Sequence, residues 1–394
     1  MRKATHPIPP EEELLRRLKN VRKEMERRGF DALIIYSSPG SMRYGQRGHV
    51  MYMANYEPYF GDTMMVLPRD ENSGALLEID EAHYFPSDCT WIENIKPSTN
   101  HVSTAKDYLQ KIGLKKPKIG IVGDYSMSPA LYTSFQEETS FYQVEPASDI
   151  IENERIIKSE WELQSIREAS RIAKKGIEAA ARLARPGVQD LEIAAEVERT
   201  CRIEGSEFFP HYTMVSSGPD EKYSSCWWKC GQRHLQEGDI LLLDFGTMYN
   251  GYCCDIARPF IVGRHPSQAQ KDVFEVLKQA MEIGRKAAHE GAFASDVDKA
   301  VRKIYKDTWP DETSWGAGHG VGLEVHEWPF IGYHAITHDP AYRDTELKAN
   351  TVISLEPTIS IPGLGDFQLE DEFVVTGTGA ERLNDIPQEI IMCR

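Results

Sequence analysis

The feature that most constrains the fold of this chain is a set of acidic residues and one histidine that stand beside apolar or glycine-rich segments in its second half. In chain order they are Asp244, Asp255, His319, Glu356 and Glu370. Their neighbours predict buried side chains, and an unpaired buried carboxylate is costly. Four carboxylates and an imidazole can share one buried site only where cations hold them together. The chain is therefore expected to fold so that these residues meet around bound metal ions.

The first two of these residues flank a predicted β-hairpin. Asp244 follows the apolar run Ile240-Leu-Leu-Leu, and Asn250-Gly251 is a strong signal for a two-residue turn. A turn at this point places Asp255 roughly opposite Gly246 and one diagonal step from Asp244. Both carboxylates can then face the same side of the ribbon.

His319 lies in the segment Gly316-Ala-Gly-His-Gly-Val-Gly322, whose small residues allow close approach of backbone and substrate. A second imidazole, His326, follows on the same segment. Carboxylates together with an imidazole suit manganese, iron, cobalt or zinc. Two such ions can convert a bridging water to hydroxide near neutral pH and stabilise a tetrahedral oxyanion. Hydrolysis of an amide or related C–N bond is the chemistry that such a site serves best.

Periodicity divides the chain into two parts. An amphipathic helix is expected at 11–29, and strands at 32–36, 63–67, 75–79 and 118–122 with a helix near 104–112. Strands that alternate with helices indicate an α/β domain. A long helix then opens near Ser159, whose spacing to Glu162 matches a capping box. We therefore expect one domain over 1–153 and a second over 154–394.

The second part contains a faint internal repeat. The segments Ala184–Ile193 and Ala288–Val297 each follow a predicted helix and precede another, and each carries an apolar residue six positions after a glycine. Two related halves that face each other could build one site at their interface. A coincidental similarity of two helix-turn-helix segments is the alternative.

Composition excludes several classes of function. The net charge of −16 argues against a nucleic-acid partner, because phosphate binding needs a basic surface. No apolar run approaches the roughly 18 residues that span a bilayer, and the N-terminus shows no signal-peptide core. The seven cysteines, an odd number, indicate reduced thiols. A cytoplasmic protein without membrane contact is expected.

With these motifs, the chain resembles the pita-bread-fold metallopeptidases, which include methionine aminopeptidase, Xaa-Pro aminopeptidase, prolidase and the non-peptidase creatinase. The resemblance covers nearly the whole chain and rests on the ordered set of five residues, the Gly-His-Gly-Val-Gly segment, and the Glu356-Pro and Glu370-Asp pairs. It implies an α+β fold, with a pita-bread catalytic domain after an α/β creatinase/prolidase-type N-terminal domain. It also implies a homodimer.

The resemblance further implies how the residues divide two divalent metal ions between them. Asp244 and Asp255 resemble the carboxylate ligands of one ion, with Asp255 bridging and Glu370 as the second bridge. His319 and Glu356 resemble the remaining ligands of the other ion. Mn²⁺ is the expected metal, with Fe²⁺, Co²⁺ or Zn²⁺ as alternatives. Glu356 is also the implied proton acceptor from the bridging water.

The second histidine, His326, resembles the family residue that contacts substrate and stabilises the tetrahedral intermediate. Other positions depart from the family. A proton-handling histidine usually stands shortly before the first aspartate ligand, but residues 224–230 here read Ser-Ser-Cys-Trp-Trp-Lys-Cys. His211 could reach the pocket from another direction. Trp227 and Trp228 could offer a face to a cationic nitrogen, although tryptophans are more often core residues.

Two departures follow the histidine segment. Gln368 stands where the family usually has arginine, so a charged contact is lost. Tyr333, with His334, His338 and Tyr342, can reshape the rim of the pocket. The predicted substrate-binding residues are therefore His211, Trp227, Trp228 and Tyr333.

Three functional hypotheses remain open. The leading one is a metal-dependent hydrolase of the Xaa-Pro dipeptidase/aminopeptidase type that acts on small peptides. The second is an enzyme for a small nitrogenous or cationic molecule on the same scaffold, as in creatinase, ectoine hydrolase or a dimethylsulfoniopropionate lyase, and the altered 226–230 stretch motivates it. The third is a non-catalytic binding protein like the proliferation-associated relatives, which typically lose the ligands that this chain keeps.

Overall fold

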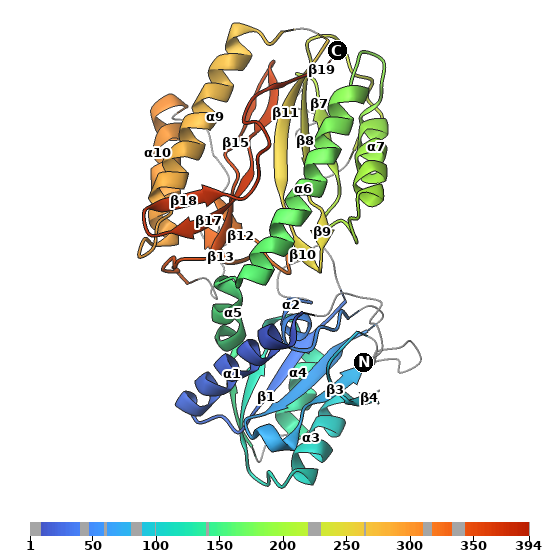
Figure 1. Ribbon diagram of the computed structural model, residues 1–394, viewed down its shortest axis with the longest axis vertical. Helices are drawn as coiled ribbons and strands as arrows, with labels where there is room; N and C mark the ends of the chain where they lie inside the picture. The colour runs from blue at the N-terminus through green and yellow to red at the C-terminus, as the bar shows by residue number, and fades with distance from the viewer. Residues whose placement is uncertain are drawn as a thin grey trace. The chain divides into compact units, whose positions relative to one another are not determined.

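The computed structural model describes residues 9–39, 47–58, 61–79, 89–98, 100–138, 142–219, 230–263, 265–309, 317–332 and 343–393. The chain forms two compact units, Met1–Arg155 and Ile156–Arg394 (Figure 1). None of the helices within the described ranges is long and apolar enough to cross a membrane.

The first unit is built on a six-stranded mixed sheet in the order β4-β3-β2-β1-β5-β6. The strands are β1 Ala32–Ser37, β2 Thr63–Pro68, β3 Leu76–Ile79, β4 Asn94–Pro97, β5 Lys118–Val122 and β6 Gln143–Pro146. The helices are α1 Glu11–Arg28, α2 Gly48–Ala54, α3 His101–Lys111, α4 Pro129–Glu138 and α5 Ser148–Ile156. Alternate residues of β1, such as Ile34 and Tyr36, share a core with Leu109 of α3 and Phe135 of α4. This is the α/β architecture that the alternation of strands and helices predicts.

The second unit consists of two halves, and each half has two helices followed by strands. The similar segments around Gly187 and Gly291 predict such a repeat. The first half consists of α6 Glu160–Leu183, α7 Asp190–Ile203, β7 Met214–Ser217, β8 Ile240–Phe245, β9 Met248–Tyr249, β10 Tyr252–Cys253 and β11 Ile256–Val262. The second consists of α9 Gln268–Ala287, α10 Ala294–Thr308, β12 Gly318–Gly320, β13 Glu327–Ile331, β14 Val352–Leu355, β15 Thr358–Ile361, β16 Gly365–Gln368 and β17 Asp371–Thr376. The short strands β18 Gly379–Arg382 and β19 Ile391–Cys393 follow.

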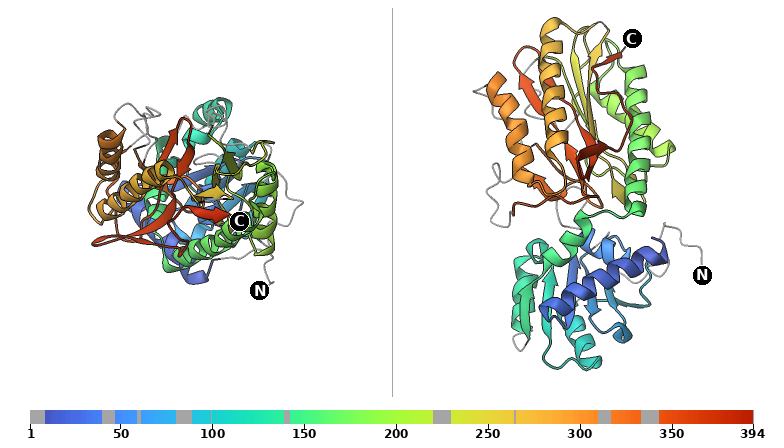
Figure 2. Two further views of the ribbon diagram at one scale, coloured as in Figure 1. Left: turned by 90° about the horizontal axis from the view of Figure 1, so that it is seen from above. Right: turned by 60° about the vertical axis from the view of Figure 1, so that its left-hand side comes forward.

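Each half buries its own helix pair against its own sheet. Strands β19-β11-β8-β7 form one sheet and β13-β12-β14-β17-β18 the other. The first sheet shares a core with α6 and α7, and the second shares a core with α9 and α10. The two helix pairs therefore lie on opposite sides of the strands (Figures 1 and 2). Both long helices start at a capping box, Ser159 with Glu162 for α6 and Ser267 with Gln270 for α9.

The predicted hairpin forms with the expected register. Asn250 and Gly251 have φ values of 52° and 77°, the positive pair that a tight type I′ turn requires. Tyr249 pairs with Tyr252, and Phe245 pairs with Ile256. This register places Asp255 opposite Gly246, two positions along the ladder from the pair that Asp244 forms with Ala257 and therefore on the same face.

A buried arginine joins the two halves where β11 and β17 begin. The Arg258 side chain is fully buried and pairs with Asp371 at 2.7 Å. Its guanidinium also donates to the carbonyl oxygens of Glu370 at 2.6 Å and Pro387 at 2.8 Å. Asp255 and Glu370 lie just before these two strand starts, so Arg258 fixes the backbone on which both carboxylates stand.

Replacing Arg258 by Met should lower the free energy of unfolding of the second unit by about 3–5 kcal/mol, because the buried Asp371 would lose its close cation and keep only the more exposed Arg382, at 3.7 Å. Urea unfolding followed by tryptophan fluorescence measures this loss, since every tryptophan except Trp91 lies in Ile156–Arg394. Arg199→Met removes an exposed pair with Glu196 and should cost less than about 1 kcal/mol. Equal losses in the two variants would contradict this role of Arg258.

Candidate metal centre

The five residues predicted as ligands meet at strand ends of the two facing halves. Asp244 lies in β8 and His319 in β12, whereas Asp255 directly precedes β11, Glu356 directly follows β14 and Glu370 directly precedes β17. All except Glu356 are buried; the Glu356 side chain keeps 23% of its surface exposed. Short segments far apart in sequence thus bring their side chains to one place.

His319 lies at the centre of the carboxylates. Its Nε2 atom is 3.7 Å from an Asp255 oxygen, 3.7 Å from a Glu356 oxygen and 3.9 Å from a Glu370 oxygen. Its Nδ1 atom lies 3.1 Å from the carbonyl oxygen of Gly320, to which it can only donate. The neutral ring therefore presents the lone pair of Nε2 to the carboxylates, which is the arrangement of a metal-binding histidine.

Burial and mutual repulsion act against ionisation of these carboxyl groups. Burial, with the nearby charge of Asp255, raises the pKa of Asp244 to about 7. Burial and the charges of Asp255 and Asp244 likewise raise the pKa values of Glu356 and Glu370 well above the usual range. A divalent cation between these groups would stabilise their ionised forms.

Two buried atoms without hydrogen-bond partners among the described residues show whether this site suits metal ions. Within the described ranges, Asp244 Oδ1 and His319 Nε2 are buried and have no hydrogen-bond partner. Such atoms normally find a partner, and both are of the types that bind transition metals. The donor set of carboxylate oxygens and imidazole nitrogen therefore fits a pair of divalent ions.

Neighbouring polar groups orient one of the candidate ligands, Glu370. Ser354 in β14 donates to one Glu370 oxygen at 2.8 Å, and the amide of Gln368 donates to the other at 3.1 Å. Gln368 therefore gives a neutral hydrogen bond where the resemblance leads one to expect an arginine. Neither contact follows from sequence spacing alone, because both depend on how the loop before β17 folds back.

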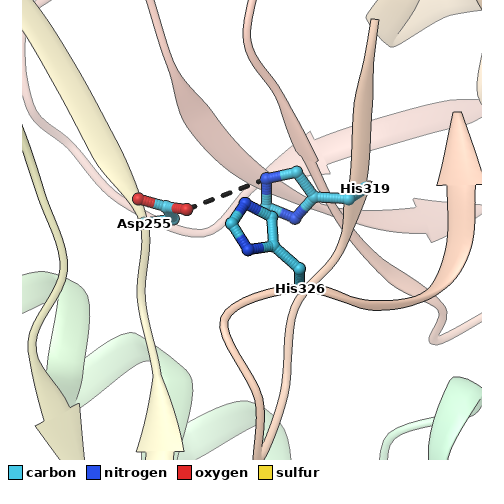
Figure 3. A group of neighbouring side chains, drawn as sticks. All are labelled: Asp255, His319 and His326. Carbon is cyan, nitrogen blue, oxygen red and sulfur yellow. Dashed lines mark ion pairs between the residues drawn. The ribbon is translucent and has the colours of Figure 1, made fainter. Parts of the chain in front are cut away.

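His326 lies beside the same ligands. Its ring centroid is 4.1 Å from that of His319, in an edge-on arrangement, and Figure 3 shows both rings next to Asp255. Ligand atoms of these three residues lie within 4.8 Å of one another. Burial keeps the pKa of His326 well below its usual value, so the ring is neutral.

A buried ion pair anchors the segment that carries His326. Lys158 Nζ lies 2.8 Å from Glu327 Oε1, and both side chains are almost fully buried. The backbone N–H of Lys158 donates to the carbonyl of Asn350. A side chain at Gly322 would collide with the Glu327 carboxylate, which explains one glycine of the predicted small-residue segment. Sequence reasoning missed this pair, because its partners are 169 residues apart.

His211 reaches the aspartate pair, as its prediction as a pocket residue requires. Its Nε2 atom is 2.9 Å from Asp255 Oδ1 and 4.0 Å from Asp244 Oδ1. Burial would lower the pKa of His211, but the Asp255 carboxylate raises it to about 9. Burial would in turn raise the pKa of Asp255, but the positive charge of His211 keeps it low. The other predicted substrate-binding residues, Trp227, Trp228 and Tyr333, lie outside the described residues.

Comparison with known families decides which scaffold this is. Residues 164–377 match the profile of metallopeptidase family M24, and residues 17–157 match the creatinase/prolidase N-terminal domain. The chain belongs to metallopeptidase family M24. The M24 match confirms the predicted pita-bread catalytic fold, and the second match confirms the creatinase-type domain before it.

Individual relatives agree with this assignment. The chain is 32% identical over 286 residues to the Xaa-Pro dipeptidase of Pyrococcus furiosus, covering 72% of this chain and 78% of that protein. The prolidase structure from Pyrococcus horikoshii superposes with a TM-score of 0.79 at 27% identity, covering 95% of this chain and all of that one (100%). The X-Pro aminopeptidase structure from Thermotoga maritima shares the fold with a TM-score of 0.82 at 24% identity, covering 95% and 99% of the two chains.

Replacing Ser354 by Ala should weaken metal binding about 10–100-fold, because Glu370 would lose the donor that orients its carboxylate. Competition for Mn²⁺ or Zn²⁺ against a chromophoric chelator measures the affinity. Ser360→Ala removes a similar but exposed hydroxyl-to-carboxylate bond, to Asp366 across the hairpin β15–β16, and should leave the affinity unchanged. Unchanged affinity in the Ser354 variant would mean that this hydrogen bond does not support a ligand.

Proposed function

We propose that this M24 enzyme is a dinuclear-metal hydrolase that cleaves Xaa-Pro dipeptides. The observation that carries the proposal is the meeting of Asp244, Asp255, His319, Glu356 and Glu370 around two orphaned ligand atoms. Relatives named Xaa-Pro dipeptidase or prolidase, matched in sequence and in fold, support the choice of substrate. Two divalent ions, Mn²⁺ first among them, would supply Lewis acidity and lower the pKa of a water at this site.

Glu356 is suited to accept the proton of the attacking water. It is the only one of the five ligand candidates that keeps a substantial exposed surface, so water and substrate can reach it. Bound cations would keep its carboxylate ionised although burial and the charges of Asp255 and Asp244 oppose ionisation, so it is free to accept a proton. A carboxylate of this kind can take a proton in one step and return it to the leaving amine in the next.

His326 is suited to contact the substrate. It lies beside His319, and because its ring is neutral it can donate one hydrogen bond from an N–H group. A donor aimed at the oxygen that gains negative charge would stabilise the tetrahedral intermediate. The Lys158–Glu327 pair holds the adjacent residue and so limits the movement of this ring.

A small nitrogenous substrate is the second candidate. The observation in its favour is the neutral amide of Gln368 on Glu370, where the family usually has an arginine. The homodimer implied by the resemblance is part of the proposal, and light scattering after gel filtration tests it.

The wild-type protein loaded with Mn²⁺ or Co²⁺ should hydrolyse at least one member of a panel of Xaa-Pro dipeptides, and a chelator should abolish this activity until metal is restored. Release of proline measures turnover, and elemental analysis of the same sample measures bound metal. A protein that holds two ions yet cleaves no dipeptide would overturn the peptidase proposal and favour the small-molecule alternative.

Replacing Glu356 by Gln should lower kcat about 10²–10⁴-fold, because the amide cannot accept the proton. Measurements at saturating metal, with the bound metal quantified, separate this loss from weaker metal binding. Glu381→Gln, on the surface strand β18, is the matched control and should keep full activity. A metal-loaded Glu356 variant with near-normal kcat would assign the proton transfer to another group.

A further inference from the structure

The Nε2 atom of His211 lies close to the carboxylates of Asp244 and Asp255. The family resemblance assigns no role to this contact. His211 lies just before β7, the first strand of the first half, and its side chain keeps only 9% of its surface exposed. The Nε2 atom forms one group with oxygens of Asp244 and Asp255, all within 4.8 Å of one another. The orphaned oxygen in this group is Asp244 Oδ1.

The hydrogen bonds of His211 determine which of its two ring nitrogens carries the proton and which one can present a lone pair to the carboxylates. Its Nδ1 atom lies 2.9 Å from the carbonyl oxygen of Tyr212 and must donate to it, because a carbonyl cannot donate. If the ring is neutral, as a bound cation would favour in place of the proton, Nε2 carries a lone pair and points to Asp255 Oδ1, which also carries lone pairs. Two acceptors at 2.9 Å need a proton or a metal ion to hold them together.

The distances suit a shared metal ion. Nitrogen and oxygen ligands bind such ions at about 2.0–2.2 Å, so two ligands at a right angle lie about 2.9 Å apart and two opposite ligands about 4.2 Å apart. His211 Nε2 is 2.9 Å from Asp255 Oδ1 and 4.0 Å from Asp244 Oδ1. One ion can therefore accept all three atoms with little movement of the side chains.

The second half of the unit shows the same arrangement around His319. There too Nδ1 lies against the carbonyl of the next residue, Gly320, and Nε2 faces carboxylates. Asp255 turns one oxygen, Oδ1, to His211 and the other, Oδ2, to His319. His211 precedes the first strand of its half and His319 lies in the first strand of its own.

We propose that His211 is a ligand of the metal ion held by Asp244 and Asp255, so that each ion of the centre has one imidazole. This inference rests on the proposed dinuclear site. An added imidazole raises the affinity of that position for Co²⁺ and Zn²⁺. The two ions of this enzyme are then alike in ligand type, and His211 adds a sixth ligand residue to the five that the family pattern gives.

The test uses Co²⁺ as the probe, added to the metal-free protein. Proton NMR of the Co²⁺-loaded wild type should show strongly shifted, exchangeable imidazole N–H signals, one of which disappears in His211→Ala. Calorimetric titration should show two bound ions in the wild type, with the affinity of only one lowered at least about 10-fold in the variant, as for other lost ligand contacts. His289→Ala is the matched control, because its Nδ1 also bonds to the next carbonyl, but the residue is exposed and belongs to none of the groups of candidate ligands among the described residues.

The opposite result is equally clear. If His211 is instead a protonated partner of Asp255, its removal frees that carboxylate, so metal affinity stays the same or rises and no shifted signal disappears; this outcome overturns the proposal. A wild type with a single shifted imidazole signal overturns it without any variant. If His211→Ala fails to fold, His211→Gln, which keeps a polar side chain, takes its place. A wild type that takes up no Co²⁺ overturns the dinuclear site itself, and this inference with it.

Discussion

Repulsion among buried carboxylates is the constraint on which the second unit depends. Asp244, Asp255, Glu356 and Glu370 would separate or take up protons if nothing opposed their charges, as the raised pKa values of three of them show. The fold opposes this by fixing the backbone rather than the side chains alone. Arg258 ties the starts of β11 and β17 together through carbonyl oxygens and Asp371. The carboxylates therefore stay close enough for cations to bind between them.

The two halves use one scaffold but differ in the length of their acidic side chains. The first half contributes aspartates and the second contributes glutamates, at matching strand ends. The Glu356 side chain keeps part of its surface exposed, whereas Asp244, Asp255 and Glu370 are buried. A nearly symmetric frame thus produces a site with one more exposed carboxylate, at the position where the proposed proton transfer needs access to water.

Local sequence signals predicted the candidate ligands that the structure brings together and the hairpin, because each signal depends on neighbours along the chain. The apolar run before Asp244 and the Asn250-Gly251 turn were enough to give the register that the structure shows. The contact of His211 with Asp255 spans 44 residues and depends on how β7 lies beside β8, so spacing could only suggest that it reaches the pocket. Lys158 looks like a solvated lysine before a helix, and only tertiary packing shows that it is buried.

The position of Lys158 also decides where the catalytic unit can be cut from the rest of the chain. The family match begins at residue 164, six positions after this lysine. A fragment that starts there would keep Glu327 in its buried place, next to His326, but lose its buried ion pair with Lys158. It would also lose the backbone bond from Lys158 to Asn350. The smallest fragment that keeps these contacts therefore includes Lys158, which lies before α6, and this residue belongs structurally to the catalytic unit.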